Sequence, residues 1–224
     1  MRRVAIAGVL WLGFCASAAA QTAAADRPGP YVIDVRGTTV SLPQDASFFP
    51  PMPRSTAVPS RAWGLDAGAH VYLVQFGAAR LGIGVMLLRV RGTTSPAKPA
   101  PTSGTSSAPA APATTPDVAA VVTAVAPQVS VNFGSRAGWS YLSAGIGRAQ
   151  VTSRTSAFAG TTQERLVESG PRSSINFGGG ARWFAKPRLA FSFDVRFHMV
   201  RAGGDVTPTP GTTLVAASVG ISLR

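Results

Sequence analysis

Hydrophobic and polar positions alternate with a period of two over much of the chain, most clearly near its end. Over residues 189–199, one set of positions holds Leu189, Phe191, Phe193, Val195, Phe197 and Met199, and the other holds Ala190, Ser192, Asp194, Arg196 and His198. This period is typical of a β-strand with two different faces. Segments of this kind predict strands near residues 30–41, 64–76, 81–92, 121–133, 138–152, 173–184, 189–201 and 212–224.

Three related segments predict tight hairpins. Residues 74–84, 131–147 and 183–193 each contain a strand that ends on Phe, a short stretch with a basic residue, and the start of the next strand. Connections this short force antiparallel pairing of the strands that they join. The connections between the hairpins are instead long and polar, and they run approximately over residues 43–63, 93–120, 154–172 and 202–211.

Short turns that alternate with long loops are typical of bacterial outer-membrane barrels, in which the turns lie in the periplasm and the loops outside. We therefore predict an all-β fold over residues 30–224, an eight-stranded antiparallel up-and-down transmembrane β-barrel with periplasmic termini. Its second loop, at about 93–117, is rich in Pro, Ala, Ser and Thr. This composition predicts disorder, because it offers little large apolar surface to offset the entropy lost on ordering.

The same alternation assigns side chains to the two faces of each strand. The inward set includes both signs of charge, in a barrel too narrow for a wide channel. Opposite charges in such a space must pair or be hydrated, so we predict a salt-bridged polar lumen with a structural role. Its predicted members are Asp34, Arg36, Asp66, His70, Arg182, Asp194, Arg196 and His198.

Aromatic residues near strand ends predict a belt at the membrane interfaces. The expected members of the belt are Tyr31, Trp63, Phe76, Phe133, Trp139, Trp183 and Phe184.

The N-terminal segment has the features of a secretory signal. Arg2 and Arg3 precede an apolar run that is too short to span a bilayer, and Ala18–Ala20 form a small-residue cleavage site. We predict a signal peptide over residues 1–20 and a short N-terminal segment over 21–29. The only cysteine, Cys15, lies in the signal, so the mature chain offers no disulfide, thiol nucleophile or Cys-based metal site.

The mature chain is strongly basic, since it has 19 basic and 9 acidic residues once residues 1–20 are removed. Export and the dispersed basic residues argue against nucleic acid as a partner. The expected partners are membrane lipids, including the phosphates of lipopolysaccharide, together with the barrel-assembly machinery, and we expect a monomer. No catalytic or cofactor motif stands out, so we expect no enzyme and no cofactor.

Residues 175–198 resemble the penultimate hairpin of small bacterial outer-membrane β-barrel proteins, the group that includes barrels similar to outer-membrane protein A. The resemblance rests on Asn176, Gly178–Gly180, Arg182, the turn Lys186–Leu189 and the triplet Asp194–Arg196. It implies a fold and an outer-membrane location. Barrels of this group usually end on an aromatic residue that the assembly machinery reads, whereas this chain ends on Arg224.

Three other functions compete with a structural or small-porin-like barrel. A soluble periplasmic β-barrel that binds an apolar ligand would share the strands and the signal, but it would lack a continuous outward apolar band. A lipid-modifying enzyme could use His70 and His198 with Ser192 or Asp194, although neither GxSxG nor HExxH occurs. Surface interaction through basic residues of the loops is the third possibility.

Overall fold

The computed structural model of the chain describes residues 29–51, 56–94, 117–135, 137–156, 164–203 and 209–224. The predicted signal peptide and most of the segments 21–29 and 93–117 lie outside the described residues.

The described chain consists of β-strands and one short 3-10 helix, η1 (Ala46–Phe48). The strands are β1 (Tyr31–Ser41), β2 (Arg61–Phe76), β3 (Ala79–Thr94), β4 (Val118–Gly134), β5 (Gly138–Thr155), β6 (Arg165–Glu168), β7 (Arg172–Lys186), β8 (Leu189–Val200) and β9 (Thr212–Leu223).

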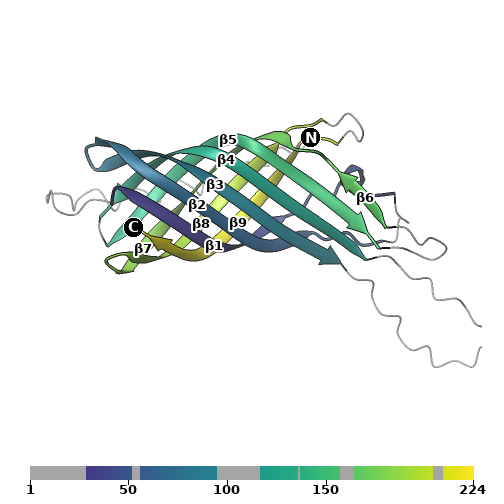
Figure 1. Ribbon diagram of the computed structural model, residues 1–224, viewed down its shortest axis with the longest axis horizontal. Coiled ribbons are helices and arrows are strands. Elements are labelled where there is room, and N and C mark those ends of the chain that lie inside the picture. Colours follow the sequence, from purple (N-terminus) through teal and green to yellow (C-terminus); the bar gives the residue numbers. More distant parts are fainter. Residues whose placement is uncertain (1–28, 52–55, 95–116, 136, 157–163, 204–208) are drawn as a thin grey trace, which may run out of the picture.

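Eight of these strands close into an antiparallel barrel, which confirms the predicted fold class (Figure 1). Their order around the wall is β4, β3, β2, β1, β9, β8, β7 and β5, and pairing between β4 and β5 closes the ring. The barrel therefore has no free edge strand in its wall, and every strand satisfies its backbone hydrogen bonds on both sides.

The two ends of the barrel differ, as the hairpin pattern predicts. Short turns join β2 to β3, β4 to β5 and β7 to β8 at the end where β9 also finishes, which we call the turn end. The first of these turns uses Gly77, whose φ of 55° is a left-handed conformation that favours glycine. We call the opposite end, where β3, β5 and β8 finish and β4 and β9 begin, the loop end.

Two connections that the sequence predicts to be irregular contain regular structure. Strand β6 pairs with residues Thr152–Thr155 of β5 beyond the barrel wall, so it extends one hairpin at the loop end without adding to the ring. The helix η1 lies in the connection between β1 and β2. Within the part of the chain that the structure describes, no helix is long and apolar enough to cross a membrane.

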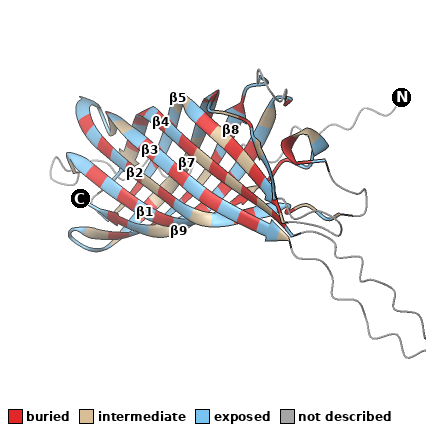
Figure 2. Ribbon diagram, turned by 45° about the vertical axis from the view of Figure 1, so that its right-hand side comes forward, coloured by how far each residue is buried: buried red, intermediate tan, exposed pale blue. Residues whose placement is uncertain are grey.

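Burial alternates along the strands, with apolar side chains exposed on the outside and a packed interior (Figure 2). On β8, for example, Phe191 and Phe197 are exposed whereas Ser192, Asp194 and His198 are buried. This is the inverse of a soluble protein, since the large apolar side chains form the outer surface.

The predicted aromatic belt is correct for some residues and wrong for two. Tyr31, Trp63, Phe76 and Trp183 are all exposed on the outer surface near strand ends. Trp139 is instead only 1% exposed, because it follows the turn between β4 and β5 on an inward-facing position. Phe184 also points inward, since it pairs with the buried Ala190 of β8 and packs against Trp139.

Candidate functional site

The interior of the barrel is the candidate site, because the structure places there all eight titratable residues that the sequence assigned to the lumen. They project inward from β1, β2, β7 and β8, and each is at most 6% exposed. The eight are Asp34, Arg36, Asp66, His70, Arg182, Asp194, Arg196 and His198.

Asp34 is the centre of a first ionic cluster. Arg182 donates to both of its carboxylate oxygens, from Nε at 2.8 Å and from Nη2 at 2.6 Å. Arg36 Nη2 lies 2.8 Å from Asp34 Oδ2, and the hydroxyl of Ser222 donates to Oδ1. One carboxylate thus binds two guanidinium groups, one of them in a bidentate geometry.

Arg36 extends this cluster across the barrel. Its Nη1 donates to Asp66 Oδ1 at 2.9 Å, and its Nε donates to the hydroxyl of Ser192 at 3.2 Å. The side chain therefore connects β1, which carries it, to neighbouring β2 and to β8, which lies two strands away.

A second cluster surrounds Asp194 and Arg196 on β8. The Arg196 guanidinium lies 3.1 Å from Asp194 Oδ2, and its Nη1 donates to Gln128 and Asn176 at 3.0 Å each. Its Nη2 also donates to the Ser143 hydroxyl at 2.7 Å. Four strands, β4, β5, β7 and β8, therefore supply partners for one buried guanidinium.

Tyr141 joins the two clusters. Its hydroxyl donates to Asp194 Oδ2 at 2.7 Å, and the guanidinium carbon of Arg182 lies 3.9 Å from the centre of its ring. The ring fits because Gly180 lies opposite. A Cβ on Gly180 would lie 2.8 Å from the Tyr141 hydroxyl oxygen and would overlap the carbonyl oxygen of Phe193.

The charges of the two ionic clusters balance. The carboxylates of Asp34, Asp66 and Asp194 face the guanidinium groups of Arg36, Arg182 and Arg196, and each of the six residues is at most 4% exposed. Among the described residues, no group of three or more His, Cys, Asp or Glu side chains is placed to hold a metal ion. The arrangement is therefore a neutral network of ion pairs.

The two histidines differ from the other six residues. Within the described residues, neither ring nitrogen of His70 or His198 has a hydrogen-bond partner. Ser192 accepts its hydrogen bond from Arg36, and Asp194 binds Tyr141 and Arg196. The serine and the carboxylate that a hydrolase would need are therefore engaged by other groups, and neither is oriented by a histidine.

An aromatic cluster closes the turn end of the interior. Trp139 packs edge-on against Tyr72, with ring centres 5.9 Å apart, and against Phe184 at 4.9 Å. Arg224 covers the cluster, since its guanidinium carbon lies 3.9 Å from the centre of the Phe184 ring and its Nε donates to the carbonyl of Pro187 at 2.6 Å.

The loop half of the interior is apolar, which the prediction of a polar lumen did not include. Its inward positions carry small and branched side chains that form one buried cluster. Members from the wall include Val40, Ala62, Met86, Leu88, Val90, Val122, Ala124, Val151 and Leu214.

The connection between β1 and β2 covers this apolar half and is not simply a polar loop. Phe48 and Phe49 are each 4% exposed and pack into the apolar cluster together with Leu42. Asp45 caps η1 by accepting hydrogen bonds from the hydroxyl and the backbone N–H of Ser47, and these hold the pKa of Asp45 below its ordinary value.

A sequence signal for the apolar half exists on β3. From Met86 to Arg91 the apolar residues Met86, Leu88 and Val90 occupy inward positions, while two arginines, Arg89 and Arg91, occupy outward positions. When the inward and outward positions of the β2–β3 hairpin are continued along β3, they place these apolar residues inside the barrel and the two arginines outside. The packing of Phe48 and Phe49 has no comparable signal, because an irregular connection shows no periodicity.

Comparison with solved structures found other small outer-membrane barrels. Neisserial surface protein A (NspA) has a TM-score of 0.50 at 10% identity, over 88% of this chain and 97% of NspA. Ail of Yersinia pestis, solved with the heparin analogue sucrose octasulfate, has a TM-score of 0.47 at 10% identity, over 86% of this chain and 95% of Ail. OprG of Pseudomonas aeruginosa also has a TM-score of 0.47, at 12% identity, over 89% of this chain and 97% of OprG.

The chain has the fold of the small eight-stranded outer-membrane β-barrels. The resemblance noted for residues 175–198 is thereby confirmed at the level of the fold. No protein-family model matches the sequence, and no curated protein matches it either. The comparison therefore informs the architecture, and the function must be argued from the interior and the surface.

Proposed function

We propose that the protein is a bacterial outer-membrane barrel with a structural or surface-interaction role, and that its interior does not conduct solutes. The observation that carries this proposal is the filling of the interior along its whole length. The aromatic cluster around Trp139 lies at the turn end, the two ionic clusters follow, and an apolar cluster covered by Phe48 and Phe49 fills the loop half.

The ionic clusters act as the structural core of the barrel in this proposal. Each guanidinium and carboxylate has partners from other strands, so the network ties together strands that are not neighbours in the wall. An ion that crossed this space would have to separate buried ion pairs. Separating such a pair leaves an uncompensated buried charge, and this cost opposes the passage of ions. The filled interior favours this role over a small-porin-like one.

The outer surface favours membrane insertion over the soluble periplasmic alternative. Exposed large side chains occur on all eight strands of the wall, among them Ile33, Leu73, Ile83, Val129, Leu142, Phe177, Phe193 and Val219. Monomeric soluble proteins rarely expose apolar patches larger than a few hundred Å². A lipid environment accounts for a band that surrounds the barrel, with the turns in the periplasm and the loops outside.

Cell fractionation tests the location. We expect full-length protein to be recovered in the outer-membrane fraction and to migrate differently in detergent gels before and after boiling, because folded barrels resist unfolding in the unheated sample. Recovery in the soluble periplasmic fraction without detergent would contradict the proposal in favour of the soluble barrel.

Planar-bilayer recording tests the closed interior. We expect the refolded protein to insert without a steady current, whereas a stable ohmic conductance would show that the packed layers leave a path for ions. A refolded open porin recorded in the same bilayer provides the control for insertion.

A further inference from the structure

In the loop-side half of the barrel wall, the outward charges are confined to one side. The outward faces of β2, β3 and β5 carry five exposed arginines in their loop-side halves, and the outward faces of β2 to β5 carry no carboxylate. The outward positions of β1, β8 and β9 carry no charged residue. The five arginines are Arg61, Arg89, Arg91, Arg148 and Arg154.

Two of these arginines lie at the same height above the turn end. Arg89 is ten residues beyond Ala79, where β3 begins, and Arg148 is ten residues beyond Gly138, where β5 begins. Ten residues span roughly 33 Å along a strand, which at a tilt of about 40° is roughly 25 Å along the barrel axis. This is about the height of the apolar band of outer-membrane barrels, so both arginines lie where lipid head groups begin.

Trp63 supports this placement. It is 66% exposed on the outside of β2 and pairs in register with Arg91. Exposed tryptophan is enriched at the level of the lipid head groups.

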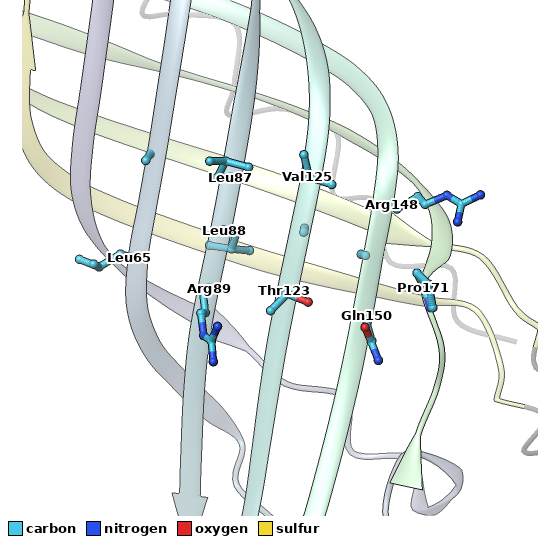
Figure 3. A pocket seen from close by; sticks show the side chains of 12 residues that line it. Leu65, Leu87, Leu88, Arg89, Thr123, Val125, Arg148, Gln150 and Pro171 are labelled. Carbon is cyan, nitrogen blue, oxygen red and sulfur yellow. The ribbon is translucent and has the colours of Figure 1, made fainter.

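Arg89 and Arg148 flank a groove of about 620 Å³ on the outer surface (Figure 3). Leu65, Leu87 and Val125 supply its apolar lining, and each of these side chains is at least 45% exposed. The two arginines come from β3 and β5, with β4 between them, so about two strand spacings, roughly 10 Å, separate their backbones. Within the described residues, neither arginine forms an ion pair or a hydrogen bond.

The groove thus combines an apolar surface below the head-group level with two exposed cations at that level. Guanidinium groups bind phosphate through paired N–H donors, and Thr123 of β4 and Gln150 of β5 add neutral polar groups to the lining. An acyl chain matches the apolar lining, whereas a soluble phosphate would leave it in contact with lipid.

We propose that this groove binds lipopolysaccharide of the outer leaflet, with its phosphates between Arg89 and Arg148 and an acyl chain along Leu87 and Val125. The inference rests on the proposed outer-membrane location, because the groove lies on the loop side of the barrel. Lipopolysaccharide fits better than a glycerophospholipid since its glycolipid head group carries more than one phosphate, and the two arginines are separated by a full strand.

Binding to the purified full-length protein in detergent micelles tests the proposal. We expect the double variant R89Q/R148Q to bind lipopolysaccharide roughly thirtyfold more weakly than the wild type, because each arginine near a lipid surface contributes about a factor of five. The control is R154Q. Arg154 is an exposed arginine of β5, the strand that carries Arg148, but it lies outside the groove and pairs with Glu164. It should change the affinity less than threefold.

The lipid is varied in the same experiment. Enzymatically dephosphorylated lipopolysaccharide should bind the wild type as weakly as intact lipopolysaccharide binds R89Q/R148Q, and the double variant should not distinguish the two lipids. Equal affinity of wild type and R89Q/R148Q, or tighter binding of phosphatidylglycerol than of lipopolysaccharide, would overturn the proposal.

A second variant pair guards against a folding defect. R89K/R148K keeps both charges and loses the paired donors, so we expect an affinity between those of the wild type and R89Q/R148Q. An affinity equal to that of R89Q/R148Q would contradict the role of charge.

Fractionation separates this inference from the proposed function. If the wild type is found in the outer membrane but binds lipopolysaccharide no more tightly than R89Q/R148Q, only the lipid site in the groove is refuted. If the wild type is found in the soluble fraction, the proposed location is refuted.

Discussion

The ionic core predicts a large effect from the removal of a single charge. Asp34→Asn keeps the volume of the side chain but leaves three guanidinium groups against two carboxylates in the two ionic clusters. Asp34 receives two hydrogen bonds from Arg182 and an ion pair from Arg36, and all three residues are at most 4% exposed. Loss of one partner of such a buried pair costs about 3–5 kcal/mol.

A double-mutant cycle isolates the interaction between Asp34 and Arg182. Arg182→Met alone should destabilise the barrel by a similar amount, because it leaves Asp34 with the single cation Arg36. The double variant restores equal numbers of positive and negative charges in the two ionic clusters. We therefore expect its loss of stability to be smaller than the sum of the two single losses by about 2 kcal/mol.

The assay is urea unfolding of the full-length protein in lipid vesicles, followed by tryptophan fluorescence. A matched surface control is Glu164→Gln, because Glu164 pairs with Arg154 at 3.5 Å while both side chains are more than half exposed. That pair should contribute less than about 1 kcal/mol. An Asp34→Asn variant as stable as Glu164→Gln, or strictly additive single losses, would refute the structural role of the ionic core.

Three further predictions concern the packing of the interior. Gly180→Ala should destabilise the barrel by about 1–3 kcal/mol in the same assay, because the added methyl group displaces Tyr141, whereas Gly37→Ala, with no atom nearer than 3.9 Å, should change stability by less than about 1 kcal/mol. Phe48→Ala should accelerate protease cleavage between β1 and β2 while heat-modifiable migration persists, and unchanged cleavage would show that the helix η1 does not anchor the connection. Trp139→Ala should lower the free energy of unfolding by about 3–5 kcal/mol. It should still give no steady current in planar bilayers, because the ionic clusters remain. A steady current would show that the aromatic cluster at the turn end is what blocks the passage of ions.

Much of the wall could be predicted because each strand carries its own signal. The alternation over β8 identifies a two-faced strand without reference to its neighbours, and the Phe-ended hairpins fix antiparallel pairing between adjacent strands. The same parity rule placed Asp34, Arg182 and Arg196 on the inward side. The ends of strands were less accurate. For example, β2 begins at Arg61 rather than at 64, because pairing with β1 and β3 extends it beyond the alternating segment.

The contacts inside the barrel could not be predicted in the same way. Parity shows that Asp34 and Arg182 share the interior, but 148 positions separate them and only the closed ring sets them face to face. Trp139 was assigned to the membrane interface because its position near a strand end matched that of Trp183. Whether Trp139 faces the lumen or the membrane depends on the residue at which the turn between β4 and β5 begins. A shift of one residue in that position moves the side chain to the other face of the wall.

The sequence by itself determined the number of wall strands and the face on which most side chains of each strand lie, since these depend on local composition and on a period of two; export stays a prediction. The tertiary structure decided which carboxylate meets which guanidinium, that the loop half of the interior is apolar, and that Arg89 and Arg148 flank one groove. The physical reason is ring closure. Strand order, register and tilt bring together residues from distant strands, and no segment of the chain carries that information alone.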